Sequence, residues 1–331
     1  MSKILVTGAT GFIGKNLVHR LLAEGHYVRA LVRNCERAKK LLGNGNIEYV
    51  VGDITDKKSL EHICDGIDVV YHLAAIMGHD LPSPVAFEKF RKVNTNGTRI
   101  IAESCLGKGI DKFIYVSSTA AMGLLRNGTV NEETPCQPYT PYQVSKYEGE
   151  LIVKELTEKS GLPGVILRPS MVYGVGFKGD FVTIARVIKI GVFPKIGFGK
   201  NLSPALYIDD VIDCMSKAKN HSAVGQTYII SSPESYELER VVRIIASALH
   251  VNVRMIFVPT CVAVFGAWIL ERVLILLGKK PVVTARNIVS AATDRVFDVS
   301  KAQRELGFQP RVPIEQGLTM TVNYFQAQGY V

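Results

Sequence analysis

The chain has 331 residues, 47% of them hydrophobic and 21% charged, which is the balance of a folded globular protein and excludes a disordered or low-complexity chain. Its formal net charge of +9 favours anionic partners; because no basic run or nucleic-acid-binding motif is present, we expect the phosphates of a nucleotide and no nucleic acid. The six cysteines are scattered without a CxxC pair, which predicts no metal site, free thiols and a reducing, cytoplasmic compartment.

Short apolar strands alternate with helical patterns through the first half of the sequence. We predict strands at residues 4–7, 27–32, 47–51, 69–73, 112–116 and 164–167. Helices are predicted at residues 12–24, 34–42, 93–107 and 142–160, and a short helix begins at 59–63. The alternation predicts an α/β fold with a doubly wound parallel sheet and helices on both of its faces. The first apolar run is too short for a signal peptide.

The pattern changes after about residue 170, where glycine and proline become frequent and helices mix less regularly with short strands. We therefore divide the chain into residues 1–170 and a smaller α/β region at residues 171–331. We expect some segments of the second region to return to the first sheet.

One later stretch, residues 256–277, is mostly apolar and about as long as a membrane span. Pro259 lies near its start, and Glu271 and Arg272 interrupt it, which makes a spanning helix costly. The pattern favours a buried helix or a lid. It leaves open a helix that rests on a membrane surface or guards an apolar substrate pocket.

Three glycines follow the first strand and open the first helix: Gly8, Gly11 and Gly14, in the spacing GxxGxxG. In a dinucleotide-binding loop, the first glycine permits a tight turn, the second lets the backbone approach a pyrophosphate, and the third lets the helix pack on the strand. The helix N-terminus offers N–H groups and the positive end of its dipole to the phosphates. Strand, loop and helix together predict a dinucleotide site.

The end of the second strand distinguishes between the two nicotinamide cofactors. NAD-binding chains usually place a carboxylate there, about 20 residues after the glycines, to hold the ribose hydroxyls. This sequence has Arg33, whose guanidinium suits the 2′-phosphate of NADP. We therefore favour NADP(H) and leave NAD(H) open. After the third strand, Asp53 is expected to accept the adenine amino group and Asp56 to cap the next helix.

Tyr142 and Lys146 form a YxxxK pair, whose spacing puts both side chains on one helix face. A phenol with a pKa of about 10 is a poor base at neutral pH, and we expect the lysine cation to lower the pKa of Tyr142. Ser118 follows the strand at 112–116, and ligand sites in such sheets lie at the carboxyl ends of the strands. A serine there can hydrogen-bond a substrate oxygen.

These motifs resemble those of the extended short-chain dehydrogenase/reductase family. The matching segments run in order through nearly the whole chain: residues 7–14, Asp53, 72–75, 94–98, 116–118, Tyr142 with Lys146, 167–169, 207–210, 298–301 and 305–310. The resemblance implies a Rossmann dinucleotide-binding domain at residues 1–170 and a mainly substrate-binding region at residues 171–331. It implies an NAD(P)-dependent enzyme.

The resemblance also implies roles for single residues. Tyr142 is expected to be the catalytic acid/base, Lys146 to tune it and hold the nicotinamide ribose, Ser118 to bind the substrate oxygen, and Asn94 to support the site; we interpret His72 as structural. Cofactor contacts are expected from Gly8, Thr10, Gly11, Phe12, Ile13, Gly14, Arg33, Asp53, Ile54, Leu73, Ala74, Ala75, Tyr142, Lys146 and Pro169.

Two departures from the family pattern speak against sugar-nucleotide substrates. Met171 stands where those enzymes usually have an asparagine, and Ser203 where they tend to have an arginine, so contacts to a diphosphate are missing. Residues 25–33 are similar to a segment of dihydroflavonol reductases, and residues 256–277 to one of 3β-hydroxysteroid dehydrogenase-like proteins. The expected substrate pocket is mostly apolar: Met77, Ser118, Met122, Met171 and Val172.

We therefore expect an oxidoreductase that transfers hydride between nicotinamide C4 and a hydroxyl or ketone of a small hydrophobic substrate, steroid-, flavonoid- or lipid-like. The alternatives are a sugar-nucleotide or lipid-linked sugar epimerase or dehydratase with retained NAD, and a non-catalytic, cofactor-binding regulatory protein. A homodimer through the helices at 93–107 and 142–160 and peripheral membrane contact through residues 256–277 remain open.

Overall fold

The computed structural model describes all of the 331 residues except 79, 125–127, 221–222, 278–283, 286–287 and 290–291. Two of the gaps in the description flank residues 284 and 285, just beyond the apolar stretch at 256–277.

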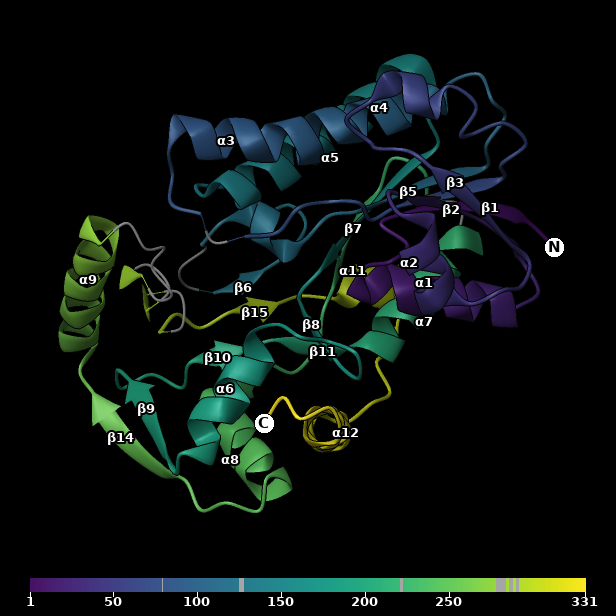
Figure 1. Cartoon of the computed structure of the whole chain (residues 1–331). Coiled ribbons are helices and arrows are strands. Elements are labelled where there is room, and N and C mark those ends of the chain that lie inside the picture. Colours follow the sequence, from purple (N-terminus) through teal and green to yellow (C-terminus); the bar gives the residue numbers. More distant parts are fainter. Residues whose placement is uncertain (79, 125–127, 221–222, 278–283, 286–287, 290–291) are drawn as a thin grey trace.

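Seven parallel strands form the central sheet (Figure 1). Their order across the sheet is β12 (Thr227–Ile230), β7 (Gly164–Pro169), β5 (Lys112–Val116), β4 (Val69–His72), β1 (Lys3–Thr7), β2 (Tyr27–Val32) and β3 (Ile47–Val51). The chain runs outward from β1 to β3 and returns to β4 on the other side of β1. Such a reversal opens a crevice at the carboxyl ends of the two strands, where α/β folds bind their ligands.

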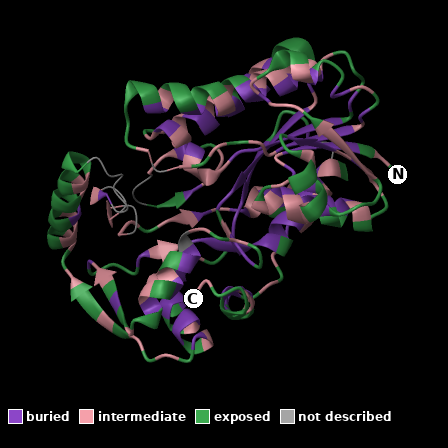
Figure 2. Ribbon diagram, viewed as in Figure 1, coloured by how far each residue is buried: buried purple, intermediate pink, exposed green. Residues whose placement is uncertain are grey.

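Helices cover both faces of this sheet (Figure 1). One face carries α1 (Phe12–Ala23) and α7 (Ile208–Asn220), and the opposite face carries α4 (Asn96–Ser104) and α5 (Pro141–Ser160). Neighbouring residues of a strand point to opposite faces, so Leu5 joins one core cluster while Ile4 and Val6 join the other. Figure 2 shows the sheet as the most buried layer of the molecule. The fold is therefore the doubly wound α/β fold that the sequence predicts.

The remaining helices of the described chain are short or lie in the second half. On the sheet side they are α2 (Cys35–Leu42), η1 (Lys57–Leu60), α3 (Pro84–Phe90), η2 (Arg91–Thr95) and η3 (Thr119–Met122). Those of the second half are α6 (Asp180–Lys189), α8 (Leu238–Ala248), α9 (Thr260–Leu276), α11 (Ser300–Leu306) and α12 (Ile314–Ala327).

Short strand pairs build the second half around the site. They are β8 (Met171–Tyr173) with β11 (Ala205–Tyr207), β9 (Val192–Ile196) with β14 (Arg254–Val258), β10 (Leu202–Ser203) with β13 (Tyr236–Glu237), and β6 (Thr129–Val130) with β15 (Val296–Phe297). One strand from this half, β12, forms an edge of the central sheet.

The strands predicted in the first half are confirmed, with shifts of one or two residues at some ends. The prediction of a helix at 93–107 starts too late. Helical structure begins at Pro84 in α3, passes through the π-helical turn η2 and ends with α4 at Ser104. Ser83 caps α3 through the Ala86 N–H, and Pro84 occupies its first turn. These are ordinary helix-start signals, and a search for apolar periodicity alone passes over them.

The expectation that residues 256–277 form a buried helix is wrong. The stretch forms β14 and α9, and Ala267 is the one buried residue of α9. The apolar composition predicts that α9 should be covered, but only one side of it is partly buried and most of its large apolar side chains are exposed. None of the helices in the described ranges is long and apolar enough to cross a membrane.

Candidate active site

The glycine loop between β1 and α1 has the geometry expected for a dinucleotide cradle. Gly8 has φ +71, and a Cβ there would lie 2.8 Å from the Ala74 nitrogen. A Cβ on Gly14 would lie 2.2 Å from the Gly8 carbonyl oxygen. A larger residue at Gly14 would therefore push α1 away from the loop, and one at Gly8 would clash with the backbone that follows β4. Gly11 caps α1 without a side chain, which leaves the helix N-terminus open toward the crevice.

A cavity of about 810 Å³ opens above this loop, at the carboxyl ends of β1, β2, β3 and β4. Residues far apart in the sequence line it: Gly8, Thr10, Gly11, Leu31, Val32, Arg33, Arg37, Gly52, Asp53, Ile54, Thr55, Leu73, Ala74, Ala75, Ile76, Val85, Glu88, Lys89, Lys92 and Val93. The glycine turn, the open helix end and the size of the cavity together fit a dinucleotide.

The cavity brings together most of the residues that the sequence predicts as cofactor contacts. Nine line it: Gly8, Thr10, Gly11, Arg33, Asp53, Ile54, Leu73, Ala74 and Ala75. Six lie outside its wall: Phe12, Ile13, Gly14, Tyr142, Lys146 and Pro169. Gly14 packs beneath the loop, and Phe12 contacts the Phe177 ring at 5.0 Å between centroids. The contacts of these six with a cofactor stay predictions.

Sequence reasoning missed three cations of the cavity wall: Arg37, Lys89 and Lys92. Arg37 lies four residues after Arg33, in the first turn of α2, and Lys92 comes from η2. Arg33 lies before α2 begins, so the spacing of the two arginines does not place them on one face. No local signal could have revealed Lys92, because the fold alone brings η2 to the cavity wall.

Asp53 is held in place at this end of the cavity. One of its carboxylate oxygens accepts from the Thr55 N–H at 2.9 Å and from the Thr55 hydroxyl at 2.8 Å. The Thr55 backbone bond, with weaker help from the charges of Arg33 and Lys92, holds the pKa of Asp53 below its ordinary value. The carboxylate is thus an ionised acceptor at neutral pH. Asp56 caps η1 through the Lys58 N–H, as predicted.

A capping box fixes the start of α5 and with it the position of Tyr142. The Thr140 hydroxyl accepts from the Gln143 N–H at 3.3 Å, and the Gln143 side chain accepts from the Thr140 N–H at 3.1 Å. Tyr142 therefore lies in the first turn of α5, with the Phe90 ring 6.3 Å away between centroids. Its side chain is half-buried.

The expected lowering of the Tyr142 pKa by Lys146 is not what the structure gives. Burial raises the pKa of Tyr142, and a hydrogen bond with Ser118 offsets part of this rise. The Lys146 ammonium donates to the Val116 carbonyl at 2.8 Å and lies 4.3 Å from the centroid of the Tyr115 ring. It is thus turned to the strand beneath the phenol, which leaves Tyr142 protonated at neutral pH.

Lys146 is itself strongly perturbed. Burial lowers its pKa to about 7, and the carboxylate of Glu150, one turn further along α5, partly opposes this. Lys146 is only 3% exposed. With a pKa of about 7, its charged and neutral forms are both populated near neutral pH. Perturbed groups of this kind are typical of functional sites.

The two serines after β5 lie in different surroundings. Ser117 is buried, and its hydroxyl donates to the Glu150 carboxylate at 2.5 Å. Ser118 is half-buried, caps η3 through the Ala120 N–H and hydrogen-bonds Tyr142. Ser118 is therefore the serine that meets the phenol, while Ser117 belongs to the polar interior.

Asn94 links the cavity wall to the helix that carries Tyr142. Its amide oxygen accepts from the Ile76 N–H at 2.8 Å, and its amide nitrogen donates to the Ile76 carbonyl and to the Ser145 hydroxyl. Asn94 is 1% exposed. Its contacts make it a positioning residue, because it does not face open space in the site.

His72 is buried in a chain of hydroxyl groups. The Thr98 hydroxyl donates to the Asn94 carbonyl at 2.6 Å, so it accepts from His72 Nε2 at 3.0 Å, and His72 Nδ1 faces the Thr7 hydroxyl at 2.7 Å. Burial lowers the pKa of His72 to about 3, so the ring is neutral. These contacts fit the structural role expected of it.

The predicted substrate-pocket residues do not form one wall. Met77 and Met171 are 76% and 37% exposed, and Val172 is half-buried. Met122 is a correction: its side chain is fully buried with Val130, Ile229 and Phe297, so it belongs to the core below the site. The glycine at position 123 ends η3 and turns the chain inward at this point, which a one-dimensional apolar pattern does not reveal.

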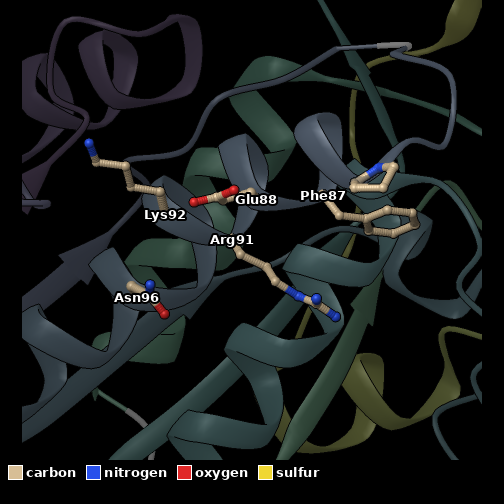
Figure 3. A pocket seen from close by; sticks show the side chains of 6 residues that line it. Phe87, Glu88, Arg91, Lys92 and Asn96 are labelled. Atoms are coloured by element: carbon tan, nitrogen blue, oxygen red, sulfur yellow. The ribbon is translucent and has the colours of Figure 1, made fainter.

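A second hollow, of about 710 Å³, lies on the outer side of α3, η2 and α4 (Figure 3). It is lined by Pro84, Phe87, Glu88, Arg91, Lys92 and Asn96. None of the predicted catalytic residues lines it. No group of three or more metal-ligating side chains gathers anywhere in the described ranges, and all six cysteines are free thiols.

The chain matches the model of the NAD dependent epimerase/dehydratase family over residues 4–231. It is 29% identical to a 3β-hydroxysteroid-dehydrogenase/decarboxylase of Arabidopsis thaliana, covering 97% of this chain and 79% of that one. It is also 29% identical to a UDP-glucose 4-epimerase of Vibrio cholerae, covering 97% and 95%. Among solved structures, a UDP-glucuronic acid 4-epimerase of Bacillus cereus in complex with NAD is similar at a TM-score of 0.78, with 26% identity over 99% of this chain and 100% of that one.

Proposed function

The chain belongs to the NAD-dependent epimerase/dehydratase family, whose members are enzymes of the extended short-chain dehydrogenase/reductase type, and on that premise we propose that it exchanges hydride between NADP(H) and an apolar alcohol or ketone. The meeting of Tyr142 with Ser118, one helical turn before Lys146 in α5, carries this proposal. A phenol, a hydroxyl and a buried cation in this arrangement serve a proton transfer to or from a substrate oxygen.

The preference for NADP over NAD rests on charge at the end of β2. Arg33, Arg37 and Lys92 line one end of the cavity. Asp53 lies in the same wall, but its carboxylate is engaged by Thr55. Three cations around one carboxylate favour an extra phosphate over bare ribose hydroxyls.

When bound, NADP(H) supplies or accepts hydride at its nicotinamide ring. The residues of the chain manage the proton. The protonated Tyr142 hydroxyl donates to the substrate oxygen in reduction and takes the proton back in oxidation. Ser118 holds the same oxygen, because it reaches the phenol by a hydrogen bond. The protonated phenol is the form that donates a proton in ketone reduction.

The proposed substrate class rests on residues at sequence positions where sugar-nucleotide enzymes contact a diphosphate, and on one further exposed apolar side chain. Met171 stands at the position where a diphosphate would need an amide, and Met77 is a second apolar side chain on the open side. Ser203 lies in the short strand β10, without a charge to offer a diphosphate. Removing an apolar ring system from water into such a site costs less free energy than removing the charged diphosphate of a sugar nucleotide.

A sugar epimerase is the second candidate, because the Vibrio cholerae relative is as similar to this chain as the plant dehydrogenase. The same Tyr142, Lys146 and Ser118 would serve it, with NAD retained between turnovers. A non-catalytic, cofactor-binding protein is less well supported, since all three side chains are present and close together.

A homodimer through α4 and α5 is also a proposal. These helices pack side by side on the outside of the sheet, and Leu151 of α5 is 46% exposed (Figure 1). A pair of such helices from each copy would bury this side chain.

The proposed function is tested by offering steroid and flavonoid ketones and UDP-sugars to the purified protein with NADPH. We expect consumption of NADPH with at least one apolar ketone and none with the sugars. Conversion of a UDP-sugar to its epimer without net consumption of nucleotide would overturn the proposal in favour of the second candidate.

A further inference from the structure

The helix α9 stands apart from the rest of the molecule (Figure 1). It is 17 residues long, and Figure 2 shows it as mostly exposed, with some partly buried residues. Its sequence, TCVAVFGAWILERVLIL, is apolar except for a few positions. Such a helix is unstable in water unless something covers it.

The exposed apolar side chains of the described residues concentrate here. Of the 24 large hydrophobic residues that are exposed, 11 lie between residues 256 and 277. Phe265 is 62% exposed, Leu276 86% and Phe257, in the adjoining strand β14, 43%. Phe198, which is 92% exposed, contacts the Phe257 ring at 4.4 Å between centroids. We refer to residues 189–200 and 254–277 together as the apolar arm.

The distribution of exposed apolar side chains around α9 distinguishes between a protein groove and a lipid bilayer as its cover. Val262, Phe265, Ile269, Val273 and Leu276 follow one side at helical spacing, but Trp268, Leu270, Ile275 and Leu277 are exposed on other sides. A protein groove covers one face of a helix, whereas lipid chains surround it. The exposed apolar side chains of α9 spread over more than one side, so a bilayer fits them better than a groove does.

Charge on the apolar arm favours an anionic lipid surface. The arm contains Lys189, Lys195, Lys200, Arg254 and Arg272 and a single acidic residue, Glu271. Lys195 and Lys200 pair with Glu239 and Glu237, and the Arg272 guanidinium lies 5.7 Å from the centroid of the Trp268 ring. Basic side chains beside buried aliphatic and tryptophan side chains are typical of helices that lie in the membrane interface.

We propose that the apolar arm docks the protein on an anionic membrane, with α9 lying in the interface between headgroups and acyl chains. At about 1.5 Å per residue α9 is shorter than a bilayer core, which agrees with its failure to qualify as a span. Membrane docking is independent of which reaction the site performs, so the two proposals fail separately. It would bring the site to a substrate that dissolves in lipid.

Trp268 makes the proposal directly measurable, because it is the one tryptophan of the chain and lies on α9. Vesicles of phosphatidylcholine mixed with phosphatidylglycerol should shift its emission to shorter wavelength, and brominated phosphatidylcholine in the same vesicles should quench it. Vesicles of phosphatidylcholine alone should give a smaller shift at equal lipid concentration, because they lack the anionic charge.

Matched variants separate docking from general surface hydrophobicity. Val273→Asp and Val262→Asp each place a carboxylate on α9 and should weaken vesicle binding roughly tenfold or more. Val224→Asp is the control, since Val224 is 41% exposed, close to the 45% of Val273, but lies outside the arm. The control should bind vesicles as the unaltered protein does. All three should unfold at nearly the same temperature, because these side chains are exposed.

Two results would overturn the proposal. One is an unchanged Trp268 emission with both kinds of vesicle. The other is a shift to shorter wavelength that grows with protein concentration in the absence of lipid, which would mean that a second copy of the chain covers α9. Either result would leave the proposed ketone reduction standing, because that activity is measured without vesicles.

Discussion

Glu150 and Arg168 form an ion pair that is buried beneath the candidate active site, with the Arg168 Nη2 atom 2.6 Å from Glu150 Oε2. Arg168 Nε donates to the other carboxylate oxygen at 2.9 Å, and the Ser117 hydroxyl donates to that oxygen as well. Glu150 is also the charge that opposes the loss of a proton from Lys146. The pair thus connects the strand β7 to the electrostatics of α5.

Removing one member of this pair should strongly destabilise the protein. We expect Glu150→Gln to lower the free energy of unfolding by about 3–5 kcal/mol, because it leaves the Arg168 cation buried without its carboxylate. Chemical denaturation measures this. The double variant Glu150→Leu/Arg168→Met should recover much of the loss, since neither charge of the pair remains; a double variant less stable than the single one would contradict the account.

Replacing the phenol should remove turnover and spare nucleotide binding. We expect Tyr142→Phe to lower kcat by roughly 10²–10⁴-fold, the usual contribution of a positioned acid. The dissociation constant for NADPH, measured by fluorescence titration, should change little, because the substitution removes one hydroxyl and keeps the ring. Ser118→Ala should lower kcat less. Near-normal turnover of Tyr142→Phe would remove this residue from the mechanism.

The choice of cofactor should depend on Arg33. We expect Arg33→Ala to weaken NADPH binding by roughly 10–100-fold, the value of charge-assisted hydrogen bonds to a phosphate, and to leave NADH binding nearly unchanged. Arg37→Ala should have the same sign and a smaller effect. Lys40→Ala is the control, because Lys40 is exposed on the same helix but lies outside the cavity wall. Equal losses for NADH and NADPH would show that Arg33 does not read the 2′-phosphate.

The buried His72 should make stability depend on acid pH. Its pKa is lowered from 6.5 to about 3, so below pH 6.5 the unfolded chain takes up a proton that the folded chain refuses. Stability should therefore be full above pH 6.5 and fall progressively as the pH drops toward 3. The melting temperature of His72→Gln, measured over the same range, should fall less steeply. Parallel pH profiles for the two proteins would count against a neutral, buried ring.

Local signals explain why much of the fold and the cofactor loop could be predicted from the sequence. The strands are apolar runs between turn residues, and the positive φ of Gly8 follows from the loop pattern. The spacing of Tyr142 and Lys146 guarantees one helix face. The spacing does not determine which atom the Lys146 ammonium contacts, and in the structure that atom is the Val116 carbonyl oxygen.

Features set by tertiary structure were out of reach of the sequence. Lys92 reaches the cavity because the fold brings η2 to its wall, and Met122 is buried just before the chain turns at Gly123. The exposure of α9 is the opposite of what its sequence predicts. An apolar pattern predicts that a helix is covered, but it does not say whether the same chain or another molecule covers it.

The most direct test of hydride exchange with a dissociable NADP(H) is to purify the protein, denature it and identify the nucleotide released. The account predicts no nucleotide held in stoichiometric amount, and reversible binding that prefers NADPH to NADH. One equivalent of NAD that resists dialysis would contradict it, because a retained cofactor means internal oxidation and reduction of the substrate, as an epimerase requires.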